Sequence, residues 1–269
     1  MANSGKLDSS RLIQITDMHL YADTDDVLVG MNCEEGLQDV LGLIHSKESA
    51  IAAVLCTGDI SQDNSSTSYK RFEKCIADFG APQYLIPGNH DELDSMKAAL
   101  GADNPCFVRS FNVPGWKIIM LDSSVKDQVH GLLAASELKM LEQELQQTGG
   151  LNVMICLHHN PVPVNAHWLQ QHALKNPEAF FGIIERFPAV KLVLFGHIHQ
   201  ELEKQVGDVT CLASPSTCIQ FHPDSHDFRL DTLNPGYRWL QLYVDGRFES
   251  GVERVPGKIY AIDFTGINY

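Results

Sequence analysis

Near-continuous apolar runs of strand length recur along this chain, and they constrain its fold more than any other feature. They cover residues 11–16, 52–57, 116–121, 151–157 and 190–195. A strand that is apolar at successive positions has both faces covered, as in a sheet that lies between helices. The runs therefore predict a layered α/β fold.

Helical patterns separate several of these runs. Apolar stripes of helical spacing run through Leu37, Val40, Leu41 and Ile44, through Tyr69, Phe72, Ile76 and Phe79, and through Leu138, Leu141 and Leu145. Asn32 and Glu35 form a capping-box pattern before the first stripe, and Ser136 is an N-cap candidate for the third. We interpret the stripes as core-facing sides of helices.

The pattern of apolar and turn-forming residues changes at about residue 205. Short strand-like runs at 209–213, 237–244 and 250–255 follow with turns between them, which predicts antiparallel β-structure. The chain has 269 residues and contains no linker-like, repetitive or low-complexity stretch. We therefore expect one domain over residues 1–269, with a β-rich C-terminal part.

Composition and charge limit the partners of the chain. The formal net charge of −14 argues against a nucleic-acid groove or an anionic membrane surface. An apolar run of 18 residues is absent, and residues 1–8 lack the order of a signal peptide, so we expect a cytoplasmic protein. Seven scattered cysteines without C-x-x-C spacing predict reduced thiols.

Polar blocks with metal-ligating residue types follow the predicted strands. They are Asp17-Met18-His19, Gly58-Asp59, Gly88-Asn89-His90-Asp91, Leu157-His158-His159 and Gly196-His197-Ile198-His199. In layered α/β folds, the loops that follow the strands converge at the edge of the sheet where the strands end. Carboxylate, amide and imidazole donors without thiolate suit two divalent ions such as Fe, Mn or Zn, and Asp59 has two oxygens with which to bridge them.

The blocks differ in specificity. An isolated Asp-x-His or Gly-Asp is common in loops that bind no metal, whereas the glycine of the Gly88 block permits a tight turn beside a ligand and a proton donor. In the Gly196 block, His197 and His199 have i, i+2 spacing, which points both side chains the same way on extended chain. Successive side chains alternate, so His158 or His159, but not both, is expected to bind metal.

In this order the blocks resemble the calcineurin-like metallophosphoesterase superfamily, whose pattern is D-x-H, G-D, G-N-H-[DE], H and G-H-x-H. Residues 12–17, 58–63, 196–202 and 214–218 further resemble bacterial class III 3′,5′-cyclic-AMP phosphodiesterases, over about residues 11–245. The resemblance implies a four-layer αββα sandwich of two mostly mixed β-sheets flanked by helices. The dinuclear site would lie at the strand ends.

The resemblance also implies roles for individual residues. Asp17, His19, Asp59 and His199 would hold one metal ion, and Asp59, Asn89, His158 and His197 the other. His19, Asp59, Asn89, His90 and His199 would contact substrate. A water shared by the ions would attack phosphorus in line, and His90 would protonate the leaving 3′ oxygen to give 5′-AMP. Asp91 would orient His90 or cap the following helix.

Other functions are compatible with parts of this pattern. A broad phosphodiesterase for 2′,3′-cyclic nucleotides, glycerophosphodiesters or nucleotide-sugar pyrophosphates would use the same metal and acid residues, and a non-catalytic interaction module would not need His90. Protein serine/threonine phosphatases carry Asp-Arg-Gly after the Gly-Asp block, where this chain has Gln62-Asp63-Asn64. We expect the partner of this chain to be a small cyclic nucleotide substrate, whose concentration the protein lowers by hydrolysis. A homodimer is a candidate assembly.

Trp168 has two possible roles in this reading. It is either a residue that stacks on the base of the substrate or a buried aromatic.

Overall fold

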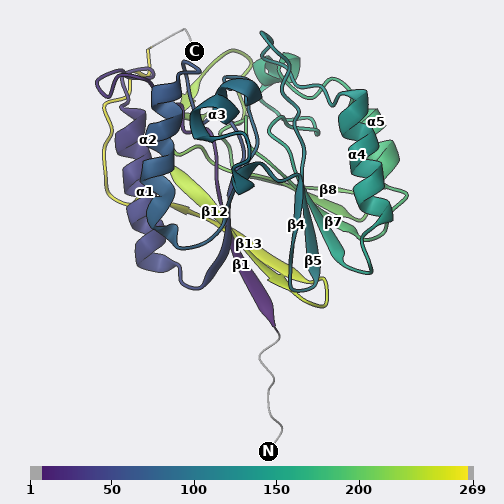
Figure 1. Cartoon of the computed structure of the whole chain (residues 1–269). Coiled ribbons are helices and arrows are strands. Elements are labelled where there is room, and N and C mark those ends of the chain that lie inside the picture. The colour runs from purple at the N-terminus through teal and green to yellow at the C-terminus, as the bar shows by residue number, and fades with distance from the viewer. Residues whose placement is uncertain (1–7, 266–269) are drawn as a thin grey trace, which may run out of the picture.

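Two β-sheets pack face to face in the computed structural model, which describes residues 8–265, and helices cover their outer faces (Figure 1). The first sheet contains β1 (Ser9–Ile15), β2 (Ile51–Cys56), β3 (Gln83–Leu85), β12 (Gly236–Tyr243) and β13 (Phe248–Arg254). The second contains β4 (Ser110–Val113), β5 (Trp116–Met120), β6 (Asn152–Cys156), β7 (Val190–Phe195), β8 (Leu202–Val206) and β9 (Val209–Ala213). A short ribbon pairs β10 (Gln220–Phe221) with β11 (Leu230–Asp231).

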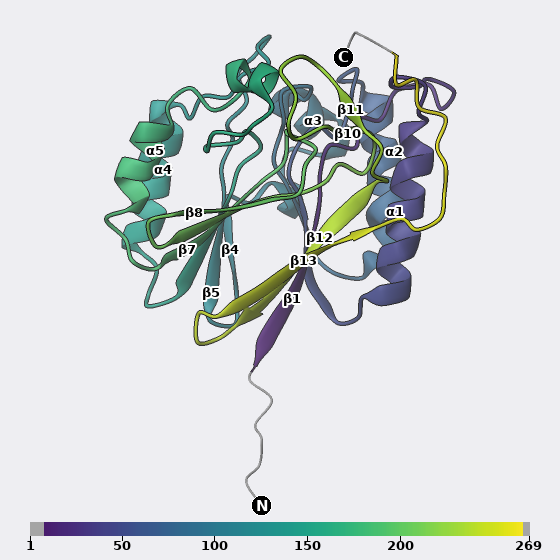
Figure 2. The same cartoon turned by 180° about the vertical axis from the view of Figure 1, so that it is seen from behind.

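Helices accompany each sheet on its own side. The α-helices are α1 (Cys33–Lys47), α2 (Ser66–Ile76), α3 (Leu93–Leu100), α4 (Ala135–Gln146) and α5 (Pro177–Ile184). The helices α1, α2 and α3 lie beside the first sheet, and α4 and α5 lie beside the second (Figures 1 and 2). The predicted α/β sandwich of two mixed sheets is confirmed. Among the described residues, no helix combines the length and apolar character needed to cross a membrane.

The order of the strands places parallel strands next to one another in each sheet. The first sheet has the order β13-β12-β1-β2-β3, in which β1, β2 and β3 are parallel. The second has the order β4-β5-β6-β7-β9-β8, in which β5, β6, β7 and β9 are parallel. The carboxyl ends of both parallel sets therefore emerge on the same side of the sandwich, above the strands in Figure 1.

Alternation along each strand divides the core into layers. Leu12 and Leu55 belong to an apolar cluster that joins the two sheets, together with Trp116 and Leu194. The neighbouring positions, such as Ile13, belong to the cluster that includes the helix residues. Burying one such side chain fully contributes about 1.5–3 kcal/mol. This two-sided burial explains why the strand sequences are apolar without alternation.

The helix signals in the sequence were partly correct. Asn32 caps α1, since its side chain accepts a hydrogen bond from the Glu35 N–H at 3.0 Å. The Glu35 carboxylate pairs instead with Lys258, at 2.8 Å. The predicted Ser136 cap is wrong: α4 begins after Ala134, so Ser136 lies inside the first turn. An N-cap must precede the helical backbone, and Ala134 provides no side-chain acceptor.

The C-terminal β-rich part completes both sheets. The strands β8 and β9 are antiparallel to each other, but β9 is parallel to β7 in the second sheet. The pair β12 and β13 is antiparallel and joins the first sheet through β1. The antiparallel prediction is therefore correct for most of these pairs and wrong for the pairing of β9 with β7. The strands β7 and β9 are parallel because β8, which lies between them in the sequence, runs in the opposite direction and pairs with β9 on its other side.

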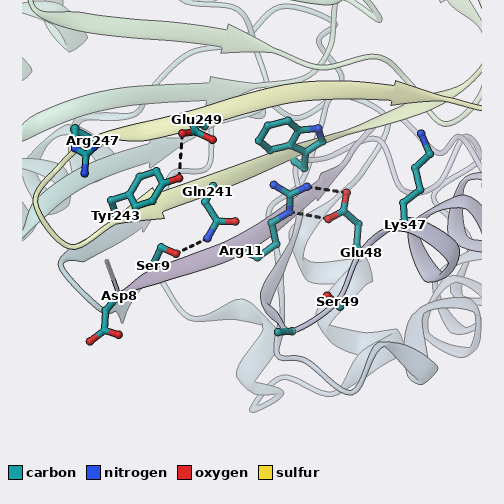
Figure 3. A pocket seen from close by; sticks show the side chains of 12 residues that line it. Asp8, Ser9, Arg11, Lys47, Glu48, Ser49, Gln241, Tyr243, Arg247 and Glu249 are labelled. Carbon is teal, nitrogen blue, oxygen red and sulfur yellow. Dashed lines mark hydrogen bonds and ion pairs between the residues drawn. The ribbon is translucent and has the colours of Figure 1, made fainter. Parts of the chain in front are cut away.

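A polar concavity lies at the opposite end of β1 from the ligand blocks, over β12 and β13 (Figure 3). Two of its charged groups pair with each other: the Arg11 guanidinium donates to both Glu48 oxygens, at 2.7 and 2.9 Å, and lies 4.0 Å from the Trp239 ring centroid. Lys47 pairs with Glu253 at 2.5 Å. These ion pairs fasten the end of α1 to the first sheet.

Candidate metal centre

Every polar block lies just beyond the carboxyl end of a strand, as the sequence predicts. Asp17 and His19 follow β1, Asp59 follows β2, and the Gly88 block follows β3. His158 follows β6, and the Gly196 block follows β7. Because these parallel strands end at the same edge, residues nearly two hundred positions apart in the sequence meet there.

Several residues in these blocks have a left-handed backbone. They are Asp17, His19, Asp59, His197 and His199, with φ between 47° and 67°. Side chains other than glycine rarely adopt this conformation, and it costs about 1–3 kcal/mol per residue. The surrounding structure holds all five in this state, which is typical of backbone strain at a functional site.

Two glycines allow the blocks to approach one another. A Cβ atom on Gly88 would lie 2.1 Å from Asp59 Oδ1, and a Cβ atom on Gly196 would lie 2.2 Å from Thr16 Oγ1. Real Cβ atoms do not come this close to other atoms, so a larger residue would push the loops apart. The glycines in these two blocks are therefore required for close packing of the site.

One group of donors comes from the ends of β1 and β7. His19 Nε2 and His199 Nε2 lie 3.2 Å apart, and His199 Nε2 lies 3.4 Å from Asp17 Oδ1. All three side chains are buried. One ligand atom from each residue lies within 4.8 Å of the other two, so they can hold one cation together.

A second group surrounds Asp59. His158 Nε2 lies 3.2 Å from Asp59 Oδ2 and 3.2 Å from Asn89 Oδ1. Asp59 Oδ2 is also 3.9 Å from His19 Nε2 in the first group. Asp59 is therefore the carboxylate that reaches both groups, and its position fits a bridge between two ions.

Hydrogen bonds on the far side of the imidazoles set their orientation. The Nδ1 atoms of His158 and His199 lie 2.8 Å from the carbonyl oxygens of Thr57 and Ile219, and His19 Nδ1 lies 2.6 Å from Gln62 Oε1. A carbonyl oxygen only accepts, so Nδ1 carries the proton and Nε2 faces the other donors. Metal-binding histidines are typically fixed in this way.

His197 completes this donor set. Its Nε2 atom is buried, and no hydrogen-bond partner for it occurs among residues 8–265. A buried nitrogen without a partner costs about 1–3 kcal/mol, which a bound cation would remove. His159, by contrast, uses both ring nitrogens: Nδ1 lies 2.8 Å from Ser123 Oγ, and Nε2 lies 3.2 Å from the Val129 carbonyl oxygen. The geometry thus favours His158 over His159 as a ligand.

The electrostatics of the centre favour carboxylates over neutral acids. Burial opposes the charge on Asp59, but His158 and His90 hold its pKa well below the usual value. Burial also disfavours charge on His158, yet Asp59 outweighs it and raises the pKa of His158 to about 9. Burial lowers the pKa of His19 to about 3. The Asp59 donor is thus an anionic carboxylate. The imidazole of His158 carries a proton that a bound cation would displace.

His90 lies at the edge of this centre. Its backbone N–H donates to Asp59 Oδ1 at 2.9 Å, and its ring centroid is 5.1 Å from that of His19. Its side chain is half-buried, whereas the aspartates and the other histidines of the donor groups are buried. The His90 imidazole therefore lies beside the donor groups and is more exposed than their aspartates and histidines.

The Asp91 carboxylate connects two loops of the centre. Its carboxylate accepts hydrogen bonds from the N–H groups of Ile60, Ser61 and Gly88, at 3.0–3.1 Å, and from the Tyr69 hydroxyl. The helix-cap prediction is wrong, because Glu92 occupies the N-cap of α3. Asp91 instead ties the Gly58-Asp59 loop to the Gly88 loop, a contact that only the folded arrangement reveals.

Sequence reasoning missed several supporting residues. Gln62 holds the His19 ring, and Ser216 Oγ donates to the Asp17 carbonyl oxygen at 2.6 Å. Both lie in segments that resemble the phosphodiesterases, but residue type alone assigns them no task. Phe221 is buried, and its ring stacks on that of His199 with the ring centroids 4.1 Å apart. Trp168, for which the sequence left two roles open, packs edge-on against Phe221 at 5.0 Å. This aromatic cluster supports the expected ligand His199.

Comparison with known proteins agrees with this geometry. The model of the calcineurin-like phosphoesterase family matches residues 10–201, and the chain belongs to this family. Its members are metal-dependent hydrolases that use a dinuclear metal site. This class accounts for the clustered donors and for the glycines that bring their loops together.

Relatives with similar sequences have more specific names. The 3′,5′-cyclic adenosine monophosphate phosphodiesterases CpdA of Pseudomonas aeruginosa and Escherichia coli are each 39% identical over 96% of this chain and 94% of the relative. A 3′,5′-cyclic-nucleotide phosphodiesterase of Nostoc, alr5338, is 38% identical over 91% of this chain and 92% of the relative. The resemblance thus extends well beyond the metal-site blocks.

Solved structures share the fold at low sequence identity. A dimetal phosphatase from Danio rerio has a TM-score of 0.62 at 15% identity and covers 91% of this chain and 99% of its own. A purple acid phosphatase from yellow lupin has a TM-score of 0.69 at 13% identity and covers 96% of this chain and 53% of its own. At these identities the comparison supports the fold alone.

Proposed function

We propose that this protein hydrolyses 3′,5′-cyclic AMP to 5′-AMP and so lowers the cellular concentration of cyclic AMP. The observation that carries hydrolysis is the buried donor cluster around Asp59, in which imidazole Nε2 atoms and carboxylates face one another. The choice of cyclic AMP is supported by the relatives from Pseudomonas aeruginosa and Escherichia coli, which are named for this activity.

The residues fit two divalent ions. We assign Asp17, His19, Asp59 and His199 to one ion and Asp59, Asn89, His158 and His197 to the other. Bound there, the ions would stabilise the charge of the phosphoryl oxygens and lower the pKa of a coordinated water. Oxygen and nitrogen donors without thiolate suit Fe, Mn or Zn.

The protein residues supply orientation and a proton. The Asn89 amide and the His19 and His199 imidazoles border the space where a phosphodiester would lie, and Asp59 fixes the backbone of His90. We assign His90 as the general acid that donates a proton to the departing 3′ oxygen, since its imidazole lies beside the donor cluster. Asp91 is a positioning residue for the two loops.

A substrate panel tests this assignment. Protein reconstituted with Mn²⁺ is incubated with 3′,5′-cyclic AMP, 3′,5′-cyclic GMP, 2′,3′-cyclic AMP and bis(p-nitrophenyl) phosphate, and products are separated by chromatography. We expect turnover of 3′,5′-cyclic AMP with 5′-AMP as the product. Turnover of only the last two substrates would support a broad phosphodiesterase instead, and no turnover of any would support a non-catalytic module.

Two further predictions concern the setting of the protein. A cytoplasmic location and a homodimer stay predictions from the sequence. Cell fractionation measures the first, and light scattering of the purified protein measures the second.

A further inference from the structure

Two buried cysteines lie in contact at the back of the metal centre. Cys33 Sγ and Cys218 Sγ are 2.6 Å apart, although 185 residues separate them in the sequence. Both side chains are buried, with 2% and 0% exposure. This separation is only slightly longer than the S–S bond of a disulfide, which is about 2.05 Å. The backbones therefore already bring the two sulfur atoms close enough to bond after a small movement.

Cys218 belongs to a loop, residues 214–219, that we name the site loop. In this loop, Ser216 Oγ donates to the Asp17 carbonyl oxygen at 2.6 Å, and the Ile219 carbonyl oxygen lies 2.8 Å from His199 Nδ1. The Cys218 N–H donates to Ser216 Oγ at 2.8 Å. The site loop thus supports two of the proposed metal ligands, and Cys218 is part of the same hydrogen-bond chain.

Cys33 belongs to a different element, because it is the first residue of α1. The first turn of α1 packs directly on the site loop: a Cβ atom on Gly36 would lie 2.6 Å from the Thr217 carbonyl oxygen. A bond between the two sulfurs would therefore join the first helix to the loop that holds the ligands.

We propose that Cys33 and Cys218 are a redox-sensitive pair whose disulfide clamps the site loop to the first turn of α1. With a peroxide as the oxidant, one thiol attacks a peroxide oxygen, which gives a sulfenic acid and releases water. The second thiol then attacks that sulfur, the S–S bond forms, and a second water leaves. The two thiols lose two protons and two electrons in total, and one peroxide is reduced to two waters.

The reduced form is the resting form of this pair. Burial and the hydrogen bond with Cys218 raise the pKa of Cys33 well above its ordinary value, so little thiolate is present. The thiolate is the reactive species, and oxidation by a small peroxide is therefore expected to be slow. Once a sulfenic acid has formed, its neighbour is already in contact, which favours the disulfide over further oxidation.

Oxidation of the full-length protein by hydrogen peroxide, followed by alkylation and peptide mapping, tests the pairing. We expect a cross-linked peptide pair that contains Cys33 and Cys218 and that dithiothreitol separates. The oxidised protein should melt roughly 5–10 °C higher, because a cross-link over a long loop restricts the unfolded chain. Recovery of both cysteines as alkylated thiols, or as separate sulfinic acids, would overturn the proposal.

Variants and hydrogen exchange test the clamp. Cys33→Ser and Cys218→Ser should each abolish the shift in melting temperature, whereas Cys75→Ser, at a half-buried cysteine on α2, should retain it. If a buried serine prevents folding, the mapping of the wild-type protein decides alone. In the oxidised protein, amides of residues 214–219 should exchange roughly tenfold more slowly, with no change in α4. Unchanged exchange in the site loop would refute the clamp.

Discussion

Asp59 Oδ1 accepts a hydrogen bond from the His90 backbone N–H at 2.9 Å, while Asp59 Oδ2 lies 3.2 Å from His158 Nε2. One carboxylate thus links the loop after β2, the loop after β3 and the loop after β6. The expected metal bridge also fixes the backbone of the expected acid. Asp59 would therefore couple the expected metal binding to the expected proton donation, and variants can test each role by itself.

Replacement of Asp59 tests the bridge. Asp59→Ala removes the carboxylate that reaches both donor groups, and we expect less than one bound ion per chain together with a loss of turnover of about a hundredfold or more. Metal content is measured by inductively coupled plasma mass spectrometry after dialysis. Asp94→Ala, at an exposed position on α3, is the matched control and should bind as the wild type does. Two fully occupied ions in Asp59→Ala would disprove the bridge.

Replacement of His90 tests the acid. His90→Ala should retain its metal ions, because the backbone N–H that Asp59 holds is unchanged, but should lower kcat by about a hundredfold or more. A substrate with a good leaving group, bis(p-nitrophenyl) phosphate, should be affected much less, since its departing oxygen needs no proton. His45→Ala, at an exposed histidine on α1, serves as the control. Equal losses on both substrates would contradict proton donation by His90.

Asp91 and Tyr69 form a structural pair that denaturation can measure. Asp91→Asn replaces an acceptor oxygen by an N–H group, so at least one buried backbone donor loses its partner, at a cost of about 1–3 kcal/mol in the free energy of unfolding. Tyr69→Phe should cost about 0.5–1.5 kcal/mol. Urea titrations of both single variants and the double variant give the coupling. Strict additivity would show that the 3.0 Å contact between them carries no energy.

Acid stability is predicted from Glu144 on α4. Burial opposes its charge, but hydrogen bonds from Lys117 and Ser110 lower the pKa of Glu144. A carboxylate whose pKa is lower in the folded state stabilises the protein above its unfolded pKa, and this contribution is lost as the pH falls through the folded value. Glu144→Gln should therefore reduce stability at neutral pH and flatten its decline below about pH 4.5.

Thermal melts at pH 3–7 measure this difference. Glu142→Gln on the same helix is the control, because its pair with Arg186 is largely exposed and such pairs contribute little. A parallel decline for the wild type and Glu144→Gln would show that this carboxylate does not contribute to acid unfolding.

The apolar runs and strand-end blocks were sufficient to predict the layered fold and the group of residues that meet. Local sequence patterns indicate that both faces of the strands are buried and that the polar blocks lie at the strand ends. The structure agrees with both. The Ser136 prediction was wrong because the cap position depends on where the backbone enters the helix, and it does so directly after Ala134. The parallel pairing of β9 likewise depends on a crossover that no short pattern encodes.

Long-range contacts explain the rest of what the sequence could not predict. Asp91 accepts hydrogen bonds from Ile60 and Ser61, some thirty residues away, so its pattern in the Gly88 block gives no sign of this role. The contact between Cys33 and Cys218 joins two single cysteines without any spacing signal. Both depend on the packing of segments that are distant in the sequence.

Metal-dependent turnover of 3′,5′-cyclic AMP is the most direct measurement of the central claim. Protein is stripped with a chelator, dialysed and assayed with and without added Mn²⁺, and bound metal and 5′-AMP are quantified in the same sample. We predict no turnover in the stripped protein, and recovery of 5′-AMP formation as occupancy approaches two ions per chain. Full activity in the stripped protein, or two bound ions without any 5′-AMP, would contradict the account.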